Sequence, residues 1–170
     1  MRRPFVVNVG EELRHPGTQR PLTLAGTVPR VGLSSSRIVE GTDVHFDGTV
    51  EAQGSTVVVQ GQARAAWTGE CRRCLEPIVG ELHVDLREVF EPEPVEGETF
   101  PLDDDQVDLE PVMREVLALA LPAAPLCGED CAGPDPDAHP VGGLSDPSGQ
   151  DGQAKRDPRW AVLDQLRIDR

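Results

Sequence analysis

Apolar and polar residues alternate between residues 44 and 90, and this alternation predicts three consecutive β-strands. The first strand has apolar or small residues at every second position, namely Val44, Phe46, Gly48 and Val50. This is the period of a strand with one buried face. A turn at Gly54-Ser55 separates it from a second strand predicted over residues 56–68, and a third is predicted over 78–90. Short apolar runs at 5–9 and 21–24 predict two further strands.

The two longer strands each present one apolar face. The second strand places there Val57, Val59, Gly61, Ala63, Ala65 and Trp67, and the third places there Leu82, Val84, Leu86 and Phe90. Strands joined by such short turns run antiparallel. We therefore expect an antiparallel β-sheet or open barrel, with one face buried.

The apolar period changes after Asp108, where it becomes helical. The residues on the resulting stripe are Leu109, Val112, Met113, Val116, Leu117 and Ala120. Spacing of three and four residues places them on one side of a helix, which Pro122 then ends. This helix is expected to pack on the sheet, so the predicted fold class is α+β.

Other segments lack either period. Residues 34–36 are three serines and predict a loop, and the acidic residues 91–105 predict a solvated acidic loop. Residues 132–156 are rich in Gly, Pro and Asp and predict a disordered linker. Asp157-Pro158 then opens a predicted C-terminal amphipathic helix over 157–170, with Trp160, Leu163 and Leu166 on its apolar face. The folded domain is expected over residues 1–131.

Charge is distributed unevenly in a chain of formal net charge −14. Residues 1–74 carry nine arginines and seven acidic residues, whereas residues 75–170 carry seven basic and 23 acidic residues. The acidic half repels phosphates, so any contact with RNA must be local. No segment approaches the roughly 20 apolar residues of a membrane span. The N-terminus lacks the apolar core of a signal peptide, so we expect a cytoplasmic protein that does not associate with a membrane.

Two close cysteine pairs are the main chemical feature of the sequence. Cys71 and Cys74 lie in the predicted turn between the second and third strands, and Cys127 and Cys131 follow the predicted helix. No other cysteine occurs. Two pairs of this kind suit a structural Zn²⁺ site in which each pair supplies one edge of a tetrahedron. The turn predicts an exposed, rigidly supported ligand pair.

Other interpretations of the cysteines stay open. A redox-active Cys-x-x-Cys would need no metal, although no βαβ pattern surrounds it, and the alternative is that the cysteines have no function. His139 would be able to replace one ligand. We find no nucleophile elbow, phosphate-binding Gly loop or His-Glu-x-x-His motif. The sequence therefore predicts no enzyme and no small-molecule substrate.

Arginines at the first cysteine pair are the candidates for contact with nucleic acid. Arg72 and Arg73 lie inside the Cys-x-x-Cys turn, and Arg64 lies on the preceding strand, where it would extend a basic patch. Alternatively, the two turn arginines solubilise the turn and balance the charge of the thiolates.

The segment Cys71-Arg72-Arg73-Cys74-Leu75-Glu76-Pro77 resembles the YceD-like family of large ribosomal RNA subunit accumulation proteins. The helix ending at Leu121-Pro122, the segment Pro125-Leu126-Cys127 and the closing Asp157-Pro158-Arg159-Trp160 carry the same resemblance. It implies a metal-binding, non-enzymatic role in accumulation of 23S rRNA. Relatives with more cysteines continue the second pair with another Cys-x-x-Cys, where this chain reads Ala132-Gly133-Pro134. The two pairs together are then its route to four thiolates.

The sequence thus predicts a zinc-stabilised ribosome-assembly factor whose partners are 23S rRNA, a pre-ribosomal particle or ribosomal proteins. An acidic adaptor that binds basic ribosomal proteins without touching RNA is the alternative, and a thiol-redox protein is a third possibility.

Overall fold

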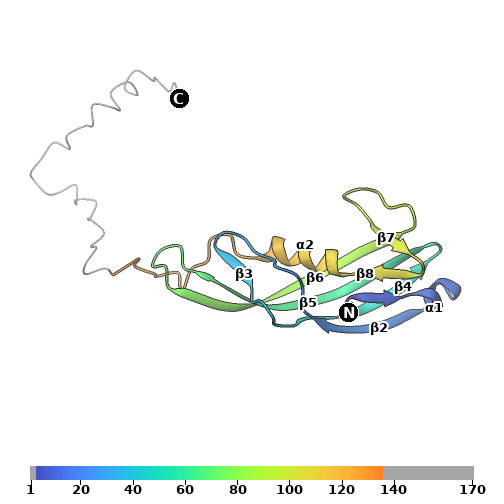
Figure 1. The fold of residues 1–170 in the computed structure, drawn as a ribbon, viewed down its shortest axis with the longest axis horizontal. Helices are drawn as coiled ribbons and strands as arrows, with labels where there is room; N and C mark the ends of the chain where they lie inside the picture. Colours follow the sequence, from blue (N-terminus) through green and yellow to red (C-terminus); the bar gives the residue numbers. More distant parts are fainter. Residues whose placement is uncertain (1–2, 136–170) are drawn as a thin grey trace, which may run out of the picture. The chain divides into compact units, whose positions relative to one another are not determined.

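A computed structural model describes residues 3–135 (Figure 1). The chain divides into two compact units, Met1–Pro134 and Asp135–Arg170, and the description below concerns the first. The predicted helix 157–170, His139 and all but the first four residues of the predicted linker 132–156 lie outside the described residues. The elements in chain order are β1 (Val6–Asn8), α1 (Gly10–Arg14), β2 (Gln19–Gly26), β3 (Ser36–Ile38), β4 (Val44–Gln53), β5 (Thr56–Glu70), β6 (Pro77–Glu91), β7 (Phe100–Asp103), β8 (Gln106–Asp108) and α2 (Glu110–Ala120).

One curled sheet contains all of these strands. Its order is β1-β8-β7-β6-β5-β4-β2, and β3 pairs separately with β5. Every pairing is antiparallel except that of β6 with β7, which is parallel and limited to two residue pairs. The sheet with its two helices gives a mixed α+β domain dominated by β-structure, as a curled half-barrel. The predicted class is thereby confirmed in its main lines.

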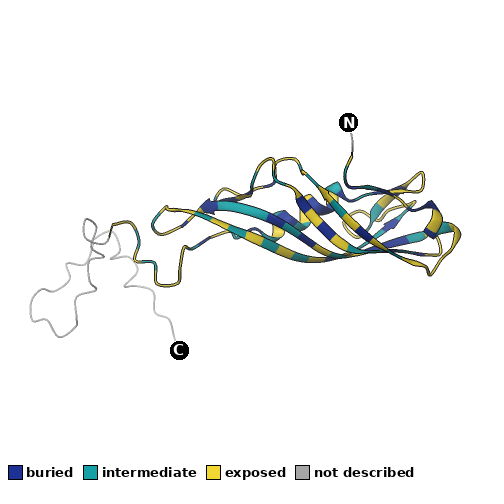
Figure 2. Cartoon of the chain, turned by 90° about the horizontal axis from the view of Figure 1, so that it is seen from below, coloured by how far each residue is buried: buried dark blue, intermediate teal, exposed yellow. Residues whose placement is uncertain are grey.

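The long hairpin of β5 and β6 forms the centre of the sheet. Each strand has 15 residues, and the pairing runs from Val57↔Phe90 to Glu70↔Pro77. Burial alternates along most of β6 and over the middle of β5, whereas Val57, Val58 and Val59 at the start of β5 are all buried; Figure 2 shows the banding. Val57, Val59 and Ala63 are fully buried, which confirms the predicted apolar face of β5. The two ends of this hairpin are therefore far apart, and its turn carries the first cysteine pair.

Helix α2 supplies the second layer of the core. It packs on β6, and its stripe confirms the predicted helix: Val112, Met113 and Leu117 are fully buried together with Leu109, which precedes the helix. The Asp108 carboxylate accepts a hydrogen bond from the Glu110 N–H at 3.0 Å and so satisfies one free donor of the first turn. The helix ends at Ala120, and the next residue, Leu121, leaves the helical conformation with φ −60° and ψ 135°.

Two segments predicted as loops contain strands, so those predictions are wrong in part. Ser36 begins β3 rather than lying in a serine loop, and Phe100–Asp103 of the acidic stretch forms β7. Strands of three or four residues are too short to show a period of two, and their pairing is decided by distant partners. The connection without regular secondary structure is shorter than predicted, covering residues 92–99 between β6 and β7.

Two glycines face each other across β4 and β5. Gly48 pairs with Gly61, and the Phe46 ring covers them. A Cβ atom at Gly61 would lie about 2.5 Å from the Gly48 Cα and 2.9 Å from the Phe46 Cζ. Only glycine allows the strands and this ring to pack so closely.

Candidate metal centre

The first cysteine pair occupies the β5–β6 turn, as predicted from the sequence. The Cys71 N–H donates to the Glu76 carbonyl at 2.9 Å, and the Leu75 N–H donates to the Cys71 carbonyl at 2.9 Å. Leu75 has a positive φ of 63°, which closes the turn tightly. The Arg73 N–H points at the Cys71 sulfur at 3.5 Å. These bonds fix the conformation of the turn that carries both cysteines.

The second pair is delivered to that turn by the segment that follows α2. The Arg72 N–H donates to the Pro125 carbonyl at 3.0 Å, which joins the turn to this segment two residues before Cys127. The hydroxyls of Ser35 and Ser36 donate to the carbonyls of Ala123 and Pro122, both at 2.8 Å. The serines, predicted only as a loop, therefore fix the path that brings Cys127 to the turn. Nothing in the sequence pattern indicated this role.

The four sulfurs converge to the dimensions of one metal site. The Cys71 Sγ lies 3.8 Å from the Cys131 Sγ, and the Cys74 Sγ lies 3.7 Å from the Cys127 Sγ. All four sulfurs lie within 4.8 Å of one another. A Zn–S bond of about 2.3 Å gives a tetrahedral edge of about 3.8 Å, so the two short contacts already have the length that zinc requires.

The sulfur contacts also show that the cysteines are not joined as two disulfides. All four cysteines are free, and contacts of 3.7 and 3.8 Å far exceed a disulfide bond of about 2.05 Å. Each short contact joins one motif to the other, across 60 and 53 residues of sequence. The cysteines thus form a single cluster made by both motifs, and a cluster of this kind is compatible with a bound metal ion.

Burial differs among the four ligands, and one prediction is corrected here. Cys71 is fully buried, whereas Cys127 is exposed, and Cys74 and Cys131 lie between these extremes. The pair at the turn was expected to be exposed. Cys71 is buried because the segment carrying Cys127 and Cys131 packs over it, and the sequence around the turn alone does not reveal that cover.

The electrostatics of the cluster favour a cation. Backbone N–H groups of Cys74 and Cys127 lower the pKa of the Cys71 thiol to about 6. The neighbouring thiols, Cys131 first, raise the pKa of Cys127 to about 12. One sulfur is therefore readily ionised, and its charge opposes ionisation of a nearby thiol. A divalent cation at the centre would allow all four to ionise together.

Arg73 connects the two cysteine motifs directly. Its Nη1 donates to the carbonyl oxygens of Glu129 and Cys131, both at 3.0 Å. The Cys131 N–H donates in turn to the Gly128 carbonyl at 3.3 Å, which closes the loop of the second pair. The Nη1 nitrogen of Arg73 is thus occupied by a structural contact. The sequence predicted a nucleic-acid contact for Arg73 and did not predict this structural role.

The other two candidate arginines lie in different places. Arg72 is exposed in the turn beside the cluster, and no side-chain partner is found for it among the described residues. Arg64 lies on β5 and forms an ion pair with Asp47 on β4. Seven residues of strand separate it from Cys71, about 23 Å at 3.3 Å per residue. The structure therefore does not bring Arg64 together with Arg72 and Arg73 in one patch.

The fold and the site define a class of protein: a β-rich domain in which a four-cysteine cluster joins the β5–β6 turn to the segment after α2. Residues 59–167 match the family described as large ribosomal RNA subunit accumulation protein YceD, and the chain belongs to that family. The matched range includes both cysteine pairs. The resemblance read from the turn and the closing segment is therefore confirmed.

Similar curated proteins come from mycobacteria. Uncharacterised proteins of Mycobacterium tuberculosis and Mycobacterium bovis are each 34% identical over 168 residues, which cover 94% of this chain and 80% of the relative. An uncharacterised protein of Mycobacterium leprae is 32% identical over 141 residues, covering 76% of this chain and 64% of the relative. No solved structure matches the chain. Among the described residues, no helix has the length and apolar character needed to cross a membrane.

Proposed function

We propose that the protein is a non-enzymatic cytoplasmic factor that supports accumulation of 23S rRNA during ribosome assembly, and that one structural Zn²⁺ ion holds its four-cysteine cluster together. The observation that carries the metal part is the convergence of four sulfurs within 4.8 Å of one another, with two of the contacts, 3.7 and 3.8 Å, at the length of a tetrahedral edge. Membership of the YceD family supports the ribosomal part.

A zinc ion bound by Cys71, Cys74, Cys127 and Cys131 would serve structure rather than catalysis. Four protein thiolates complete a tetrahedral shell and leave no position for water or substrate. The ion would fasten the β5–β6 turn to the segment after α2, and its binding free energy would add to folding. This supports a role as a binding factor.

Contact with RNA would be made near this cluster. Arg72 is exposed in the turn, and the nitrogens of Arg73 other than Nη1 have no protein partner among the described residues. A guanidinium on a rigid turn suits phosphate contacts, because its orientation costs little entropy to fix. Because residues 75–170 carry 23 acidic and only seven basic residues, we propose that RNA binding is confined to the turn.

The test separates the metal from the RNA. The full chain purified without added zinc should contain about one zinc ion, and Cys127→Ser should lose it. Arg72→Glu should keep the metal but weaken binding to 23S rRNA fragments and reduce its salt dependence, whereas the control Arg87→Glu on β6 should leave binding unchanged. In cells lacking the protein, 23S rRNA should fall relative to 16S rRNA, and Arg72→Glu should restore it poorly.

An acidic adaptor that binds basic ribosomal proteins without RNA is the second candidate, and the net charge of −14 favours it. If the wild-type chain binds no 23S rRNA fragment even at low salt but binds a purified basic ribosomal protein, the adaptor replaces the RNA-binding factor.

A further inference from the structure

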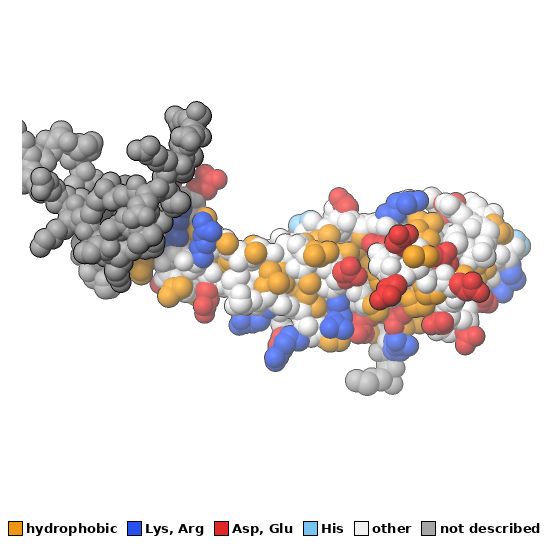
Figure 3. Space-filling model, turned by 90° about the horizontal axis from the view of Figure 1, so that it is seen from above, with side chains coloured by type: hydrophobic (Ala, Val, Ile, Leu, Met, Phe, Trp, Pro, Cys, Tyr) orange, Lys and Arg blue, Asp and Glu red, His pale blue; other side chains and the backbone are white. Residues whose placement is uncertain are grey.

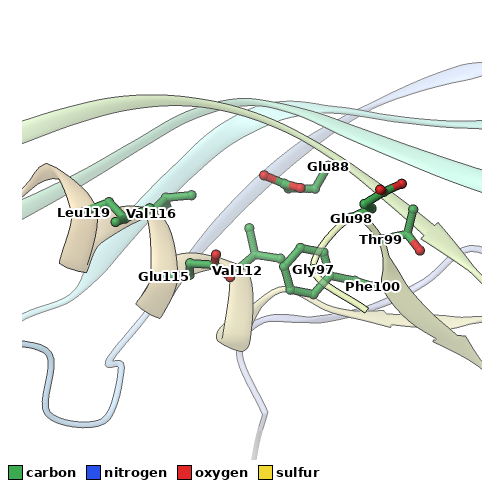
Figure 4. Close-up of a pocket in the computed structure, with 9 residues that line it drawn as sticks. All are labelled: Glu88, Gly97, Glu98, Thr99, Phe100, Val112, Glu115, Val116 and Leu119. Carbon is green, nitrogen blue, oxygen red and sulfur yellow. The ribbon is translucent and has the colours of Figure 1, made fainter. Parts of the chain in front are cut away.

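A groove lies on the other part of the domain, between β6, α2 and the segment that leads into β7. It has a volume of about 280 Å³ (Figure 4). Apolar side chains from two elements line it: Phe100 at the start of β7, and Val112 and Val116 on α2. Glu88 on β6 lies about 11 residues of strand from Pro77, or about 36 Å along the strand. The groove is therefore separate from the cysteine cluster.

The apolar lining of the groove continues onto the surface through Leu119. This residue follows Val116 by three positions and Val112 by seven, which places all three on one side of α2. Leu119 is 81% exposed, the largest exposure of any large hydrophobic residue in the described part of the chain. A leucine left in water beside an apolar groove marks surface that a partner would cover.

Carboxylates border this apolar surface. Glu88, Glu98 and Glu115 come from β6, from the segment before β7 and from α2, and all three line the groove. None of them forms an ion pair in the described part of the chain. Burial first, and the neighbouring Glu115 second, raise the pKa of Glu88. Figure 3, which views the domain from the side of α2 and the 92–99 connection, shows apolar surface interspersed with carboxylates.

We propose that this groove binds a basic segment of a protein partner. Lysine or arginine head groups of that segment would meet Glu88, Glu98 and Glu115, and its aliphatic side chains and stems would pack on the apolar lining and on Leu119. The charge identifies the class of partner, because three carboxylates without an ion pair in the described part of the chain repel the phosphates of a nucleic acid and attract a cationic peptide. The inference goes beyond the proposed function, since it gives the domain a second binding surface.

Site-specific photo-crosslinking identifies the occupant. A photo-reactive amino acid replaces Leu119 in the full chain expressed in cells, with a control chain carrying it at Leu33, another exposed apolar position. We expect crosslinks from position 119 to a peptide rich in lysine and arginine, absent from the control. Crosslinks chiefly to RNA, to a neutral or acidic peptide or to a second copy of this chain would overturn the proposal.

Affinity for a defined probe tests the chemistry. The probe is a fluorescent 12-residue peptide of alternating arginine and leucine, followed by anisotropy. Glu88→Gln/Glu115→Gln should weaken its binding about tenfold, and Leu119→Ser, which alters only an exposed side chain, should weaken it as well. The matched control Glu11→Gln/Asp43→Asn removes the same charge from two exposed positions elsewhere and should change it less than about twofold.

An equal loss in both double variants would mean that the peptide responds only to total charge, and the proposal would fail. Arg72→Glu should leave peptide binding intact, so failure at the groove and failure of RNA binding at the turn remain distinguishable.

Discussion

Arg73 reaches from the first cysteine motif to the Cys131 carbonyl oxygen, 3.0 Å from its Nη1. The same nitrogen also donates to the Glu129 carbonyl. An arginine between two candidate metal ligands thus orients the loop that carries the other two. The side chain of its neighbour Arg72, which has the same charge, makes no such contact within residues 3–135, so Arg72 serves as a matched control.

Arg73→Ala is therefore expected to weaken zinc binding although it removes no ligand. Outer contacts that orient metal ligands contribute about 10–100-fold in metal affinity, and we expect a loss in this range. Competition with a chromophoric chelator measures it. Arg72→Ala should leave the affinity within about twofold, and an equal loss in both variants would show that charge rather than the hydrogen bonds is responsible.

Removal of the metal should lower the melting temperature of the domain. If the free zinc concentration is about 1,000 times the dissociation constant, zinc binding stabilises the fold by about 4 kcal/mol. Loss of the ion then lowers the melting temperature by roughly 10 °C. Calorimetry with and without a chelator measures the difference. Cys127→Ser should melt at the lower temperature in both conditions, because Cys127 is exposed and its loss affects little but the site. A wild type indifferent to chelator would contradict the zinc proposal.

Zinc affinity should also fall as the pH is lowered from 8 towards 6. All four thiols must be deprotonated to bind, and although the pKa of Cys71 is about 6, that of Cys127 is raised to about 12. Binding must therefore release protons, which a lower pH opposes. Titrations in two buffers of different ionisation enthalpy count the protons released; a pH-independent affinity would argue against a thiolate site.

The ion pair of Glu12 and Arg20 predicts loss of stability in acid. Glu12 is 3% exposed, and its hydrogen bond from Arg20 lowers its pKa in the folded protein. The unfolded chain therefore binds a proton at Glu12 more readily than the folded protein does. The stability that the ion pair contributes is present above the unfolded pKa near 4.5, and it is lost as the pH falls through the lower pKa of Glu12 in the folded protein. Glu12→Gln should lower the free energy of unfolding by about 1–3 kcal/mol at neutral pH. Urea denaturation at a series of acidic pH values should then show a weaker dependence of that free energy on pH than in the wild type. Glu11→Gln, exposed beside it, is the control.

Close packing at Gly61 predicts that even alanine is not tolerated. Its added methyl group would meet the backbone of Asp47 and Gly48 and the Phe46 ring. We expect a cost of about 3 kcal/mol, since overpacking against backbone leaves little room to relax. Urea denaturation measures it. The exposed neighbour Gln60→Ala should change stability by less than about 0.5 kcal/mol, and a similar result for Gly61→Ala would show that the strands separate easily.

The parts of the fold that the sequence predicted are those with a sustained period. The long strands β5 and β6 and the helix α2 each repeat their apolar position at least four times, so local pattern and burial agree. The short strands β3, β7 and β8 and the five-residue α1 carry no such repeat. They form because distant segments offer partners, which a sequence read locally does not contain.

The candidate site divides in the same way. The spacing of the cysteines was sufficient to propose their ligand set, because each pair is local. The structural roles of Ser35, Ser36 and Arg73 could not be predicted from the sequence, because their hydrogen-bond partners lie 56–88 residues away along the chain. Arg64 shows the opposite error. It is close to the turn along the sequence, but seven residues of extended strand place it about 23 Å from Cys71.

The cysteine cluster also has a topological consequence. Cys74 and Cys127 are separated by 52 residues that include β6, β7, β8 and α2, and their sulfurs lie 3.7 Å apart. A metal ion joining them would hold the two ends of this long loop together in the folded domain, and its binding free energy would offset part of the entropy lost in closing the loop. The ion would then secure α2 and the groove beside it without touching either.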